Sequence, residues 1–409
     1  MKERIKETVI FTFVAAIIGI IIGALEALFG HGLTLVNEFR QSNIYIFIPL
    51  LALGGLLIAF CFKKFAKDCE KGMGLVFDVY NDKTDKMPIK LVPMMMGSTW
   101  VTHLFGGSGG REGVAVQIGA AVANRAGRFL PYMRSPKILL VAGVAAGFAG
   151  LFRTPFAAIA FALEIFVVGE IRYEALFPTI IAAFAAKYTS GLLGIQGEAF
   201  TLNVSLELDW ITFAKITAIS ILFGLIGAAF AWFLRESGRV LKERLKSPYV
   251  RIFSVGILLS VVMILTGGRY SGSGTNLIAM CFEGEAIYWQ DWIMKLVLTA
   301  ITLAAGFKGG EVTPLFAIGA TFGMLMGEIV GLPATLAAAL GYSAVFASGT
   351  GTLLAPILVS GEVFGWEYMP LFIIACGVAR VVNEWITIYP DQTALYKYTF
   401  IKRVKRRED

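Results

Sequence analysis

Charged, cysteine and histidine side chains are scarce in this chain. Only 16% of the 409 residues are charged, and the sequence contains four cysteines and two histidines. The cysteines lack the paired spacing of a metal site and the histidines lie far apart, so we expect neither a bound metal nor a disulfide framework. The sequence also has no His-Glu-x-x-His motif, P-loop or paired aspartate-rich motif. These absences predict that the chain is not an enzyme and needs no cofactor.

Apolar residues are abundant instead. They make up 57% of the chain, and the mean hydropathy is +0.72, which exceeds what a soluble domain of this length needs. Some apolar windows approach the ~20 residues of a membrane-spanning helix: Val9–Phe29, Ile44–Phe62, Phe213–Leu234 and, with the residues before it, Lys295–Phe307. We therefore expect an all-α polytopic membrane protein whose surroundings are the lipid bilayer.

The net charge of +7 is concentrated in tails and loops, so it does not indicate a nucleic-acid partner. The N-terminal MKERIK, the C-terminal KRVKRRED and the connection 235–251 are basic, and the positive-inside rule places them in the cytoplasm. Gln196–Asp209 and Glu283–Asp291 carry only acidic charge and are expected outside. Both termini are thus predicted to be cytoplasmic.

Other apolar segments are too short to cross a bilayer. Met94–Phe105, Val114–Val122, Pro155–Val168 and Leu353–Phe364 run roughly 9 to 14 residues, against the ~20 that a span needs. Interrupted helices survive at membrane depth where protein or a water-filled cavity satisfies their backbone. Many broken or partial helices are typical of a transport pathway.

Two sequence blocks recur in the same order. Gly109–Ala120 (GGREGVAVQIGA) matches Gly309–Ala320 (GGEVTPLFAIGA), and Phe148–Phe166 matches Phe346–Phe364 at nearly the same offset. Chance matching of small residues is the alternative, but two ordered matches favour a duplicated half. We expect a single membrane domain of two halves, 1–200 and 205–409, with no cytoplasmic regulatory domain. Because the boundary is expected outside and both termini inside, the repeat is inverted.

The stretch Gly106–Ala120 (GGSGGREGVAVQIGA) is the main candidate site. Glycines that open a helix aim free backbone N–H groups and the positive helix end at one point, which makes an anion site. Glu112 is itself an anion and could occupy that site. The alternative is a turn between buried helices, with Arg111 and Glu112 as a local ion pair. If the two Gly-Gly segments face each other, the substrate is a small anion held by backbone N–H groups.

Four motifs in order resemble the CLC family of anion channels and anion/proton antiporters. They are Gly72–Val76 (GMGLV), Gly110–Val114 (GREGV), Gly309–Pro314 (GGEVTP) and Thr393–Tyr396 (TALY). The resemblance covers essentially the whole membrane chain. It implies a CLC-type fold, an inverted repeat of two halves with many broken helices, assembled as a homodimer with one pathway per subunit.

The resemblance also implies roles for individual residues. Glu112 matches the gating glutamate that competes with the anion and transfers protons, and Tyr396 matches the inner-gate tyrosine, with Tyr389 and Tyr398 as nearby competitors. Glu311 is a further candidate for a proton or selectivity role, because ionisable residues at membrane depth are usually functional. The residues expected to bind the anion are Met73, Gly110, Arg111, Gly113, Val312, Thr313 and Tyr396.

Departures from the usual pattern suggest which anion is carried. Met73 replaces a serine, and together with GGEVTP it resembles the fluoride-exporting branch of the family. The expected function is therefore fluoride export in exchange for protons at the plasma membrane of a prokaryote. The alternative is a chloride/proton antiporter or gated chloride channel of the same fold. Ile165 stands where antiporters carry an internal glutamate. The adjacent Glu164, which matches Glu362 in the other half, favours a structural role. Glu26, near the end of the first span, is expected at the membrane interface.

Overall fold

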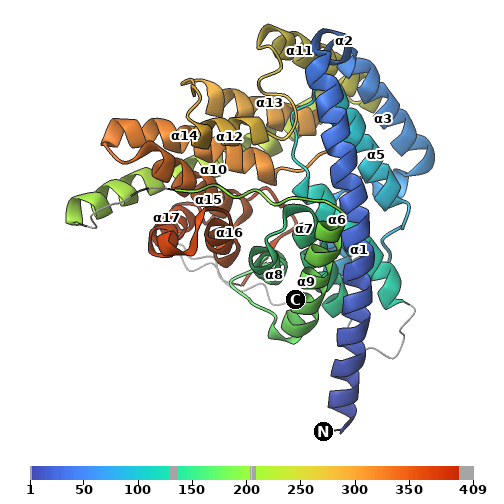
Figure 1. Ribbon diagram of the computed structural model, residues 1–409. Coiled ribbons are helices and arrows are strands. Elements are labelled where there is room, and N and C mark those ends of the chain that lie inside the picture. The colour runs from blue at the N-terminus through green and yellow to red at the C-terminus, as the bar shows by residue number, and fades with distance from the viewer. Residues whose placement is uncertain (1, 129–135, 203, 205–208, 396–409) are drawn as a thin grey trace.

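The computed structural model describes residues 2–128, 136–202, 204 and 209–395, and these are folded almost entirely into helices (Figure 1). The first half contains α1 (Lys2–Ser42), α2 (Ile44–Phe47), α3 (Leu51–Phe65), α4 (Met73–Tyr80), α5 (Leu91–Leu104), α6 (Glu112–Gly127), α7 (Pro136–Phe152), α8 (Pro155–Glu164) and α9 (Leu176–Leu192). The second half contains α10 (Trp210–Arg244), α11 (Pro248–Leu265), α12 (Thr275–Glu283), α13 (Asp291–Ala305), α14 (Val312–Val330), α15 (Ala334–Thr350), α16 (Leu354–Phe364) and α17 (Met369–Val382).

The two strands have two residues each, and their pairing links the first half of the chain to the second. β1 (Val167–Val168) follows α8, and β2 (Thr393–Ala394) follows α17; the two pair in parallel. Short 3-10 turns at Ile48–Leu50, Lys67–Cys69, Tyr173–Ala175 and Trp366–Tyr368 link neighbouring helices.

Six helical segments within the described residues are long and apolar enough to cross a membrane. Three of the predicted windows fall inside such segments: Val9–Ser42, Ile44–Phe65 and Trp210–Arg244. The predicted span around Lys295–Phe307 is wrong. That sequence forms α13, which has only 15 residues and ends at Gly306, whose φ of 115° stops the helix.

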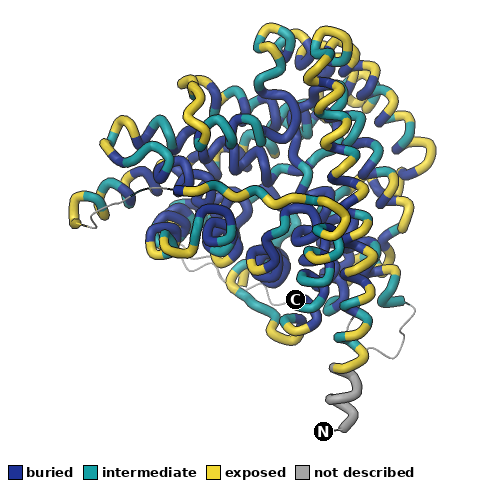
Figure 2. The backbone as a smooth tube through the Cα atoms, viewed as in Figure 1, coloured by how far each residue is buried: buried dark blue, intermediate teal, exposed yellow. Residues whose placement is uncertain are grey.

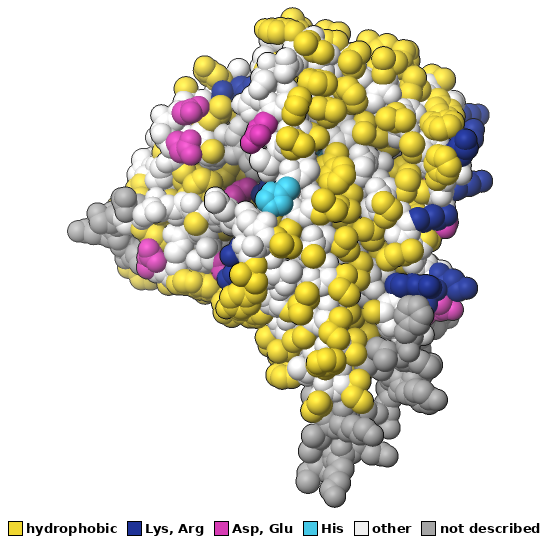
Figure 3. All heavy atoms as spheres, turned by 45° about the vertical axis from the view of Figure 1, so that its right-hand side comes forward, with side chains coloured by type: hydrophobic (Ala, Val, Ile, Leu, Met, Phe, Trp, Pro, Cys, Tyr) yellow, Lys and Arg dark blue, Asp and Glu magenta, His cyan; other side chains and the backbone are white. Residues whose placement is uncertain are grey.

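Three of the four predicted partial helices are confirmed, and the fourth, Val114–Val122, lies within the 16-residue α6. α5, α8 and α16 have 14, 10 and 11 residues, each shorter than a span. They lie among longer helices, and buried backbone fills the middle of the molecule (Figure 2). Hydrophobic side chains cover most of one outer face, with Lys and Arg side chains along one edge (Figure 3). This distribution suits a chain surrounded by lipid.

The two halves repeat one packing arrangement. A Cβ on Gly119 of α6 would lie 2.1 Å from the Gly143 carbonyl oxygen of α7, and a Cβ on Gly319 of α14 would lie 2.0 Å from that of Gly341 of α15. Backbones this close require glycine at both crossings. The order α3–α9 recurs as α11–α17, so the chain is an internal repeat of two halves. The boundaries 1–200 and 205–409 stay a prediction.

A pair of carboxylates joins the repeats reciprocally. Glu164, at the end of α8, accepts hydrogen bonds from the first N–H groups of α16, those of Leu353 (3.0 Å) and Leu354 (2.8 Å). Glu362 of α16 accepts from the first N–H groups of α8, those of Phe156 (3.3 Å) and Ala157 (2.9 Å). Negative charge at a helix N-terminus is stabilising. These contacts explain the matching glutamates as structural groups.

Candidate functional site

The two glycine loops predicted to face each other are directly bonded. The Gly110 N–H donates to the Gly310 carbonyl (2.6 Å), and the Gly310 N–H donates to the Gly110 carbonyl (2.7 Å). A Cβ on Gly310 would lie 2.7 Å from the Gly113 nitrogen, so no larger residue fits without backbone movement. This clasp fixes the start of α6 beside the start of α14. Both helix N-termini are therefore directed at one region.

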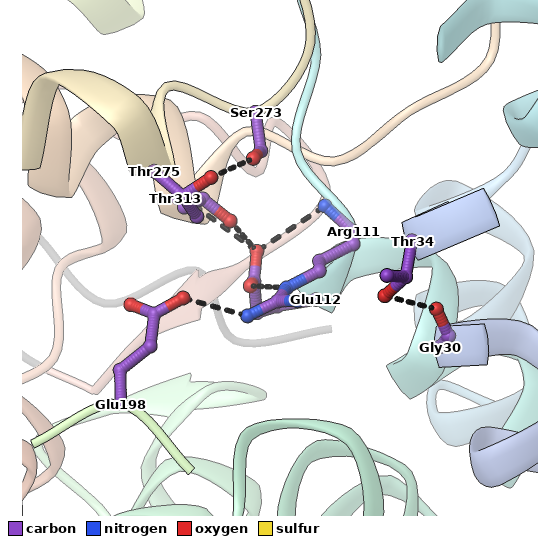
Figure 4. Close-up of polar contacts among 8 residues, drawn as sticks. All are labelled: Gly30, Thr34, Arg111, Glu112, Glu198, Ser273, Thr275 and Thr313. Carbon is purple, nitrogen blue, oxygen red and sulfur yellow. Dashed lines mark hydrogen bonds and ion pairs between the residues drawn. The ribbon is translucent and has the colours of Figure 1, made fainter. Parts of the chain in front are cut away.

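Glu112 of α6 occupies the N-terminus of α14 (Figure 4). Its Oε2 accepts hydrogen bonds from the Thr313 backbone N–H (3.1 Å) and from the Thr313 hydroxyl. The same oxygen accepts from the Arg111 N–H at 3.3 Å. The carboxylate is fully buried. Its donors are the kind that bind a small anion, so Glu112 itself takes the place of a ligand.

Arg111 connects Glu112 to a residue that the motif did not indicate. Its Nε donates to Glu112 Oε1 at 3.3 Å, and its Nη2 donates to Glu198 Oε1 at 2.8 Å. Glu198 belongs to the segment between α9 and α10, far from the glycine loops in sequence. The sequence left open a local ion pair between Arg111 and Glu112 as an alternative to an anion site. The structure contains this ion pair together with the hydrogen bonds from Thr313 to Glu112.

The loop that contains Gly72 and Met73 lies beside α6. Gly72 has φ of 56°, and Met73 begins α4 half-buried against the core. A Cβ on Gly72 would lie 3.5 Å from Gln117 Oε1, and the Gln117 amide donates to the Gly113 carbonyl at 2.9 Å. Gln117 thus lies between the Gly72 turn, which precedes Met73, and the start of α6. The sequence analysis did not single it out.

The other predicted residues surround Glu112 at the start of α14. Val312 is the first residue of α14 and is buried, as is Thr313. Glu311 directs its Oε2 toward Gly113, 3.2 Å from where a Cβ on that glycine would be. The absence of a side chain at Gly113 therefore leaves room for a second carboxylate beside the clasp.

Tyr396 and Tyr398 lie outside the described residues, whereas Tyr389 is buried near the site. Its ring contacts Phe77 of α4, with centroids 5.6 Å apart. Its hydroxyl has no partner among the described groups, and it lies within electrostatic reach of Glu311 and Glu112. Among the described residues, Tyr389 and the equally buried Tyr342 are thus tyrosines that the structure brings near the site.

A cavity of about 710 Å³ approaches Tyr389 from the side where the basic end of α10 lies. Arg235 and Arg380 line it, together with Glu164 and Gln392. Glu170 and Glu384 line it as well, so the walls of the cavity are polar and of mixed charge. Tyr389 lies in the wall of this cavity.

A family model described as voltage-gated chloride channel matches residues 54–384. The chain belongs to the CLC family. It is 34% identical over 386 residues to the chloride/fluoride channel protein of Pseudomonas syringae pv. tomato, covering 92% of this chain and 85% of the relative. It is 26% identical over 303 residues to the voltage-gated ClC-type chloride channel ClcB of Salmonella typhimurium, covering 70% of this chain and 72% of that one.

Solved CLC structures superpose on the chain. The crystal structure of a CLC-type fluoride/proton antiporter matches with a TM-score of 0.93 at 43% identity, covering 94% of this chain and 98% of that one. A slow cyanobacterial Cl⁻/H⁺ antiporter matches with a TM-score of 0.77 at 21% identity, covering 91% and 94%. The second likeness supports the fold alone. The chain is thus a multi-pass membrane protein of a family of channels and transporters.

The CLC site in this chain assembles most of the predicted residues. Glu112, Thr313 and Arg111 are in direct contact. Gly72, the residue before Met73, lies beside Gln117 of α6. Their roles in anion binding and proton transfer stay predictions.

Proposed function

We propose that this chain is a secondary active transporter that exports fluoride in exchange for protons. The observation that carries the proposal is the position of the Glu112 carboxylate at the N-terminus of α14, bonded to the N–H and hydroxyl of Thr313. A small anion that displaces Glu112 would find the same donors. Glu112 would leave the site as it takes a proton and so free these donors for the anion.

Fluoride as the substrate is supported by two features. The chain resembles a CLC-type fluoride/proton antiporter closely, and Met73 stands where chloride-selective members carry a serine. A thioether donates no hydrogen bond, so the Thr313 hydroxyl supplies the side-chain donor instead. A small, strongly hydrated anion requires short, strong donors to replace its water.

Anion and proton exchange alternate at this site. In the described state Glu112 holds the anion's place, and α14 and Arg111 neutralise its charge. Proton uptake weakens these bonds, because a neutral carboxyl interacts less with a helix N-terminus and a guanidinium. Fluoride then enters through the vacated donors. Proton entry down its gradient drives the anion outward, which suits fluoride resistance.

The setting of the transporter is part of the proposal. The chain is placed in the plasma membrane of a prokaryote with both termini cytoplasmic, as the basic tails and loops support. The halves 1–200 and 205–409 form one membrane domain, and two subunits form a homodimer with one pathway each. Its substrates are fluoride and protons, without a resident metal or cofactor, and its activity is transport rather than catalysis.

Efflux from liposomes tests the proposal. Purified protein is reconstituted with internal fluoride or chloride, and anion efflux and internal pH are recorded together. We expect fluoride efflux to drive proton uptake, with chloride far slower. Glu112→Gln is expected to abolish proton coupling, because an amide does not exchange a proton with water near neutral pH.

Other results would select the alternative. Chloride flux equal to fluoride flux and coupled to protons would indicate a chloride/proton antiporter. Anion flux without proton movement in the wild-type chain would indicate a channel. In either case the packing of α6 against α14 would stand, and Met73 would be a gap-filling residue. As a matched control, Glu285→Gln alters an exposed carboxylate in the α12–α13 connection and is expected to change neither flux.

A further inference from the structure

Arg111 stands between two carboxylates from distant parts of the chain. It donates to Glu112 Oε1 at 3.3 Å through Nε and to Glu198 Oε1 at 2.8 Å through Nη2, as Figure 4 shows. Glu112 is completely buried, whereas the side chains of Arg111 and Glu198 retain 23% and 22% exposure. The bond to Glu198 is the shorter one. Arg111 is therefore paired with both carboxylates, of which Glu198 lies nearer to solvent than Glu112.

Glu198 belongs to an anchored segment. We name residues 194–202, between α9 and α10, the strap; in Figure 1 it crosses the molecule from α9 toward α10. Its Phe200 N–H donates to the Val363 carbonyl at 2.8 Å, and the Phe200 ring stacks on Phe282 with centroids 4.6 Å apart. Tyr368 donates to the Leu202 carbonyl. The strap therefore holds the Glu198 carboxylate in place over Arg111.

The Glu198 carboxylate is only partly satisfied. Its Oε2 is buried without a hydrogen-bond partner among the described groups. Burial raises the pKa of the Glu198 carboxyl, and the neighbouring Arg111 opposes this effect. Glu198 is thus held by a single strong partner, and Arg111 is the group through which it acts.

We propose that Glu198 is a positioning residue for gating: it keeps the Arg111 guanidinium at the outer mouth while Glu112 leaves and returns. In doing so it sets the external proton concentration at which Glu112 is released from α14. The inference rests on the proposed exchange of anion for proton at Glu112.

The charges explain why a second carboxylate is needed. With Glu198 present, Arg111 remains paired when Glu112 takes a proton and leaves. Without Glu198, that departure would strand an unpaired, largely buried guanidinium, which is costly. Arg111 would then hold Glu112 more tightly in its ionised form, because a like charge is also lost from the neighbourhood. Among the described residues, the other titratable groups within electrostatic reach of this cluster are His103, Tyr342 and Tyr389, and Glu311 lies beside Gly113.

Glu198→Gln in the full chain tests the proposal. Fluoride efflux from liposomes is measured against external pH, together with the proton-to-fluoride ratio. The expected result is a rate profile displaced toward acidic pH by about one unit, the size typical of losing one neighbouring charge. The ratio of protons to fluoride should stay at the wild-type value, since Glu112 is intact.

Two further variants complete the design. Glu198→Asp retains the charge and is expected to restore most of the wild-type profile, and it also serves if Glu198→Gln fails to fold. Glu285→Gln removes an exposed carboxylate outside the cluster and should leave the profile unmoved. Elution volume and melting temperature of each variant establish that it is folded.

Contrary results are well defined. If the pH profile of the Glu198→Gln efflux rate keeps the wild-type midpoint, even at a lower rate, Glu198 has only a structural role in holding the strap. Loss of proton coupling at every pH would make Glu198 a proton carrier instead of a positioning residue. If the wild-type chain exchanges chloride for protons, the fluoride proposal fails, and the same displacement is then measured with chloride.

Discussion

At the scale of single residues, Thr313 is the donor that a carboxylate and an anion would share. Its backbone N–H and hydroxyl both bond to Glu112 Oε2. The N–H is a property of the helix, but the hydroxyl depends on the residue type. If the proposed function holds, specificity for a strongly hydrated anion would rest in part on this hydroxyl, which substitution can remove without disturbing α14.

We predict that Thr313→Val weakens fluoride binding. Valine has nearly the shape of threonine but lacks the hydroxyl, and a hydrogen bond to a charged group is worth ~1.5–3 kcal/mol, or roughly ten- to 150-fold in affinity. The measurement is fluoride binding by calorimetry in the Glu112→Gln background, where the competing carboxylate is absent. Thr313→Ser keeps the hydroxyl and should bind within a few-fold of the parent. Equal affinity of the valine variant would contradict the assignment.

Some site residues were predictable from the sequence and others were not. Glu112, Arg111 and Thr313 stand beside glycines that recur 200 positions apart, so a local pattern was sufficient. Glu198 follows no pattern, because only the path of the strap brings it to Arg111. Tyr396 lies outside the described residues, so the choice of Tyr396 over Tyr389, which depended on a resemblance between short strings, stays a prediction.

Glu26 shows a different limit. Its sequence position suggested the membrane interface, but the structure buries it completely, next to Gly150 of α7. Both of its carboxylate oxygens lack a partner among the described groups. A helix pattern reports which face is apolar, but it does not report that a glycine on another helix leaves space for a buried carboxyl.

At the scale of elements, carboxylates from one half cap helices of the other. Glu164 caps α16, Glu362 caps α8 and Glu112 caps α14. The first two are paired by the repeat, whereas the counterpart of Glu112 is Val312, which offers no carboxylate. The two halves therefore match in the Glu164 and Glu362 caps but differ at Glu112 and Val312. In the proposed function, the Glu112 cap would be exchanged for an anion while the Glu164 and Glu362 caps hold their helices.

We predict that removing either permanent cap destabilises the fold without changing anion selectivity. Glu164→Ala and Glu362→Ala each leave the first N–H groups of a short helix without their carboxylate, which costs ~0.5–2 kcal/mol. Melting temperatures in detergent should fall for both variants and fall further for the double variant. Glu285→Ala, at an exposed position, should melt as the wild type does. A loss of proton coupling with unchanged melting would instead assign Glu164 a transport role.

Element lengths were predictable only where a turn signal limited them. Pro155 and the glycines around the short helices marked α8 and α16 correctly as partial helices. Around Lys295 the hydrophobic run suggested a membrane-spanning helix. α13 is instead an amphipathic helix whose Lys295 side chain is buried in the protein. Lys295 is fully buried and donates to the Gly272 carbonyl at 2.7 Å. A mean hydropathy over a window does not reveal such a residue, because it takes no account of the hydrogen-bond partners or the burial of a single side chain.

At the scale of the whole molecule, the halves are held together by contacts that neither half can make alone. The reciprocal caps, the Gly110–Gly310 clasp and the pairing of β1 with β2 all cross between them. α14, 78% of whose apolar window is buried, lies at the centre of the molecule, whereas the first span is only 39% buried. A core shared in this way predicts that the halves unfold together.

The prediction is that probes in the two halves report one transition. Trp100 of α5 donates its indole N–H to the Phe29 carbonyl, and Trp292 of α13 packs on Phe322 with ring centroids 5.0 Å apart. Each is retained as the single tryptophan in a variant whose other tryptophans are phenylalanine, and its fluorescence is followed during thermal unfolding. Coincident midpoints are the mark of one cooperative unit. Two separated midpoints would mean that each half folds independently and that the cross-repeat carboxylates only orient finished halves around the anion site.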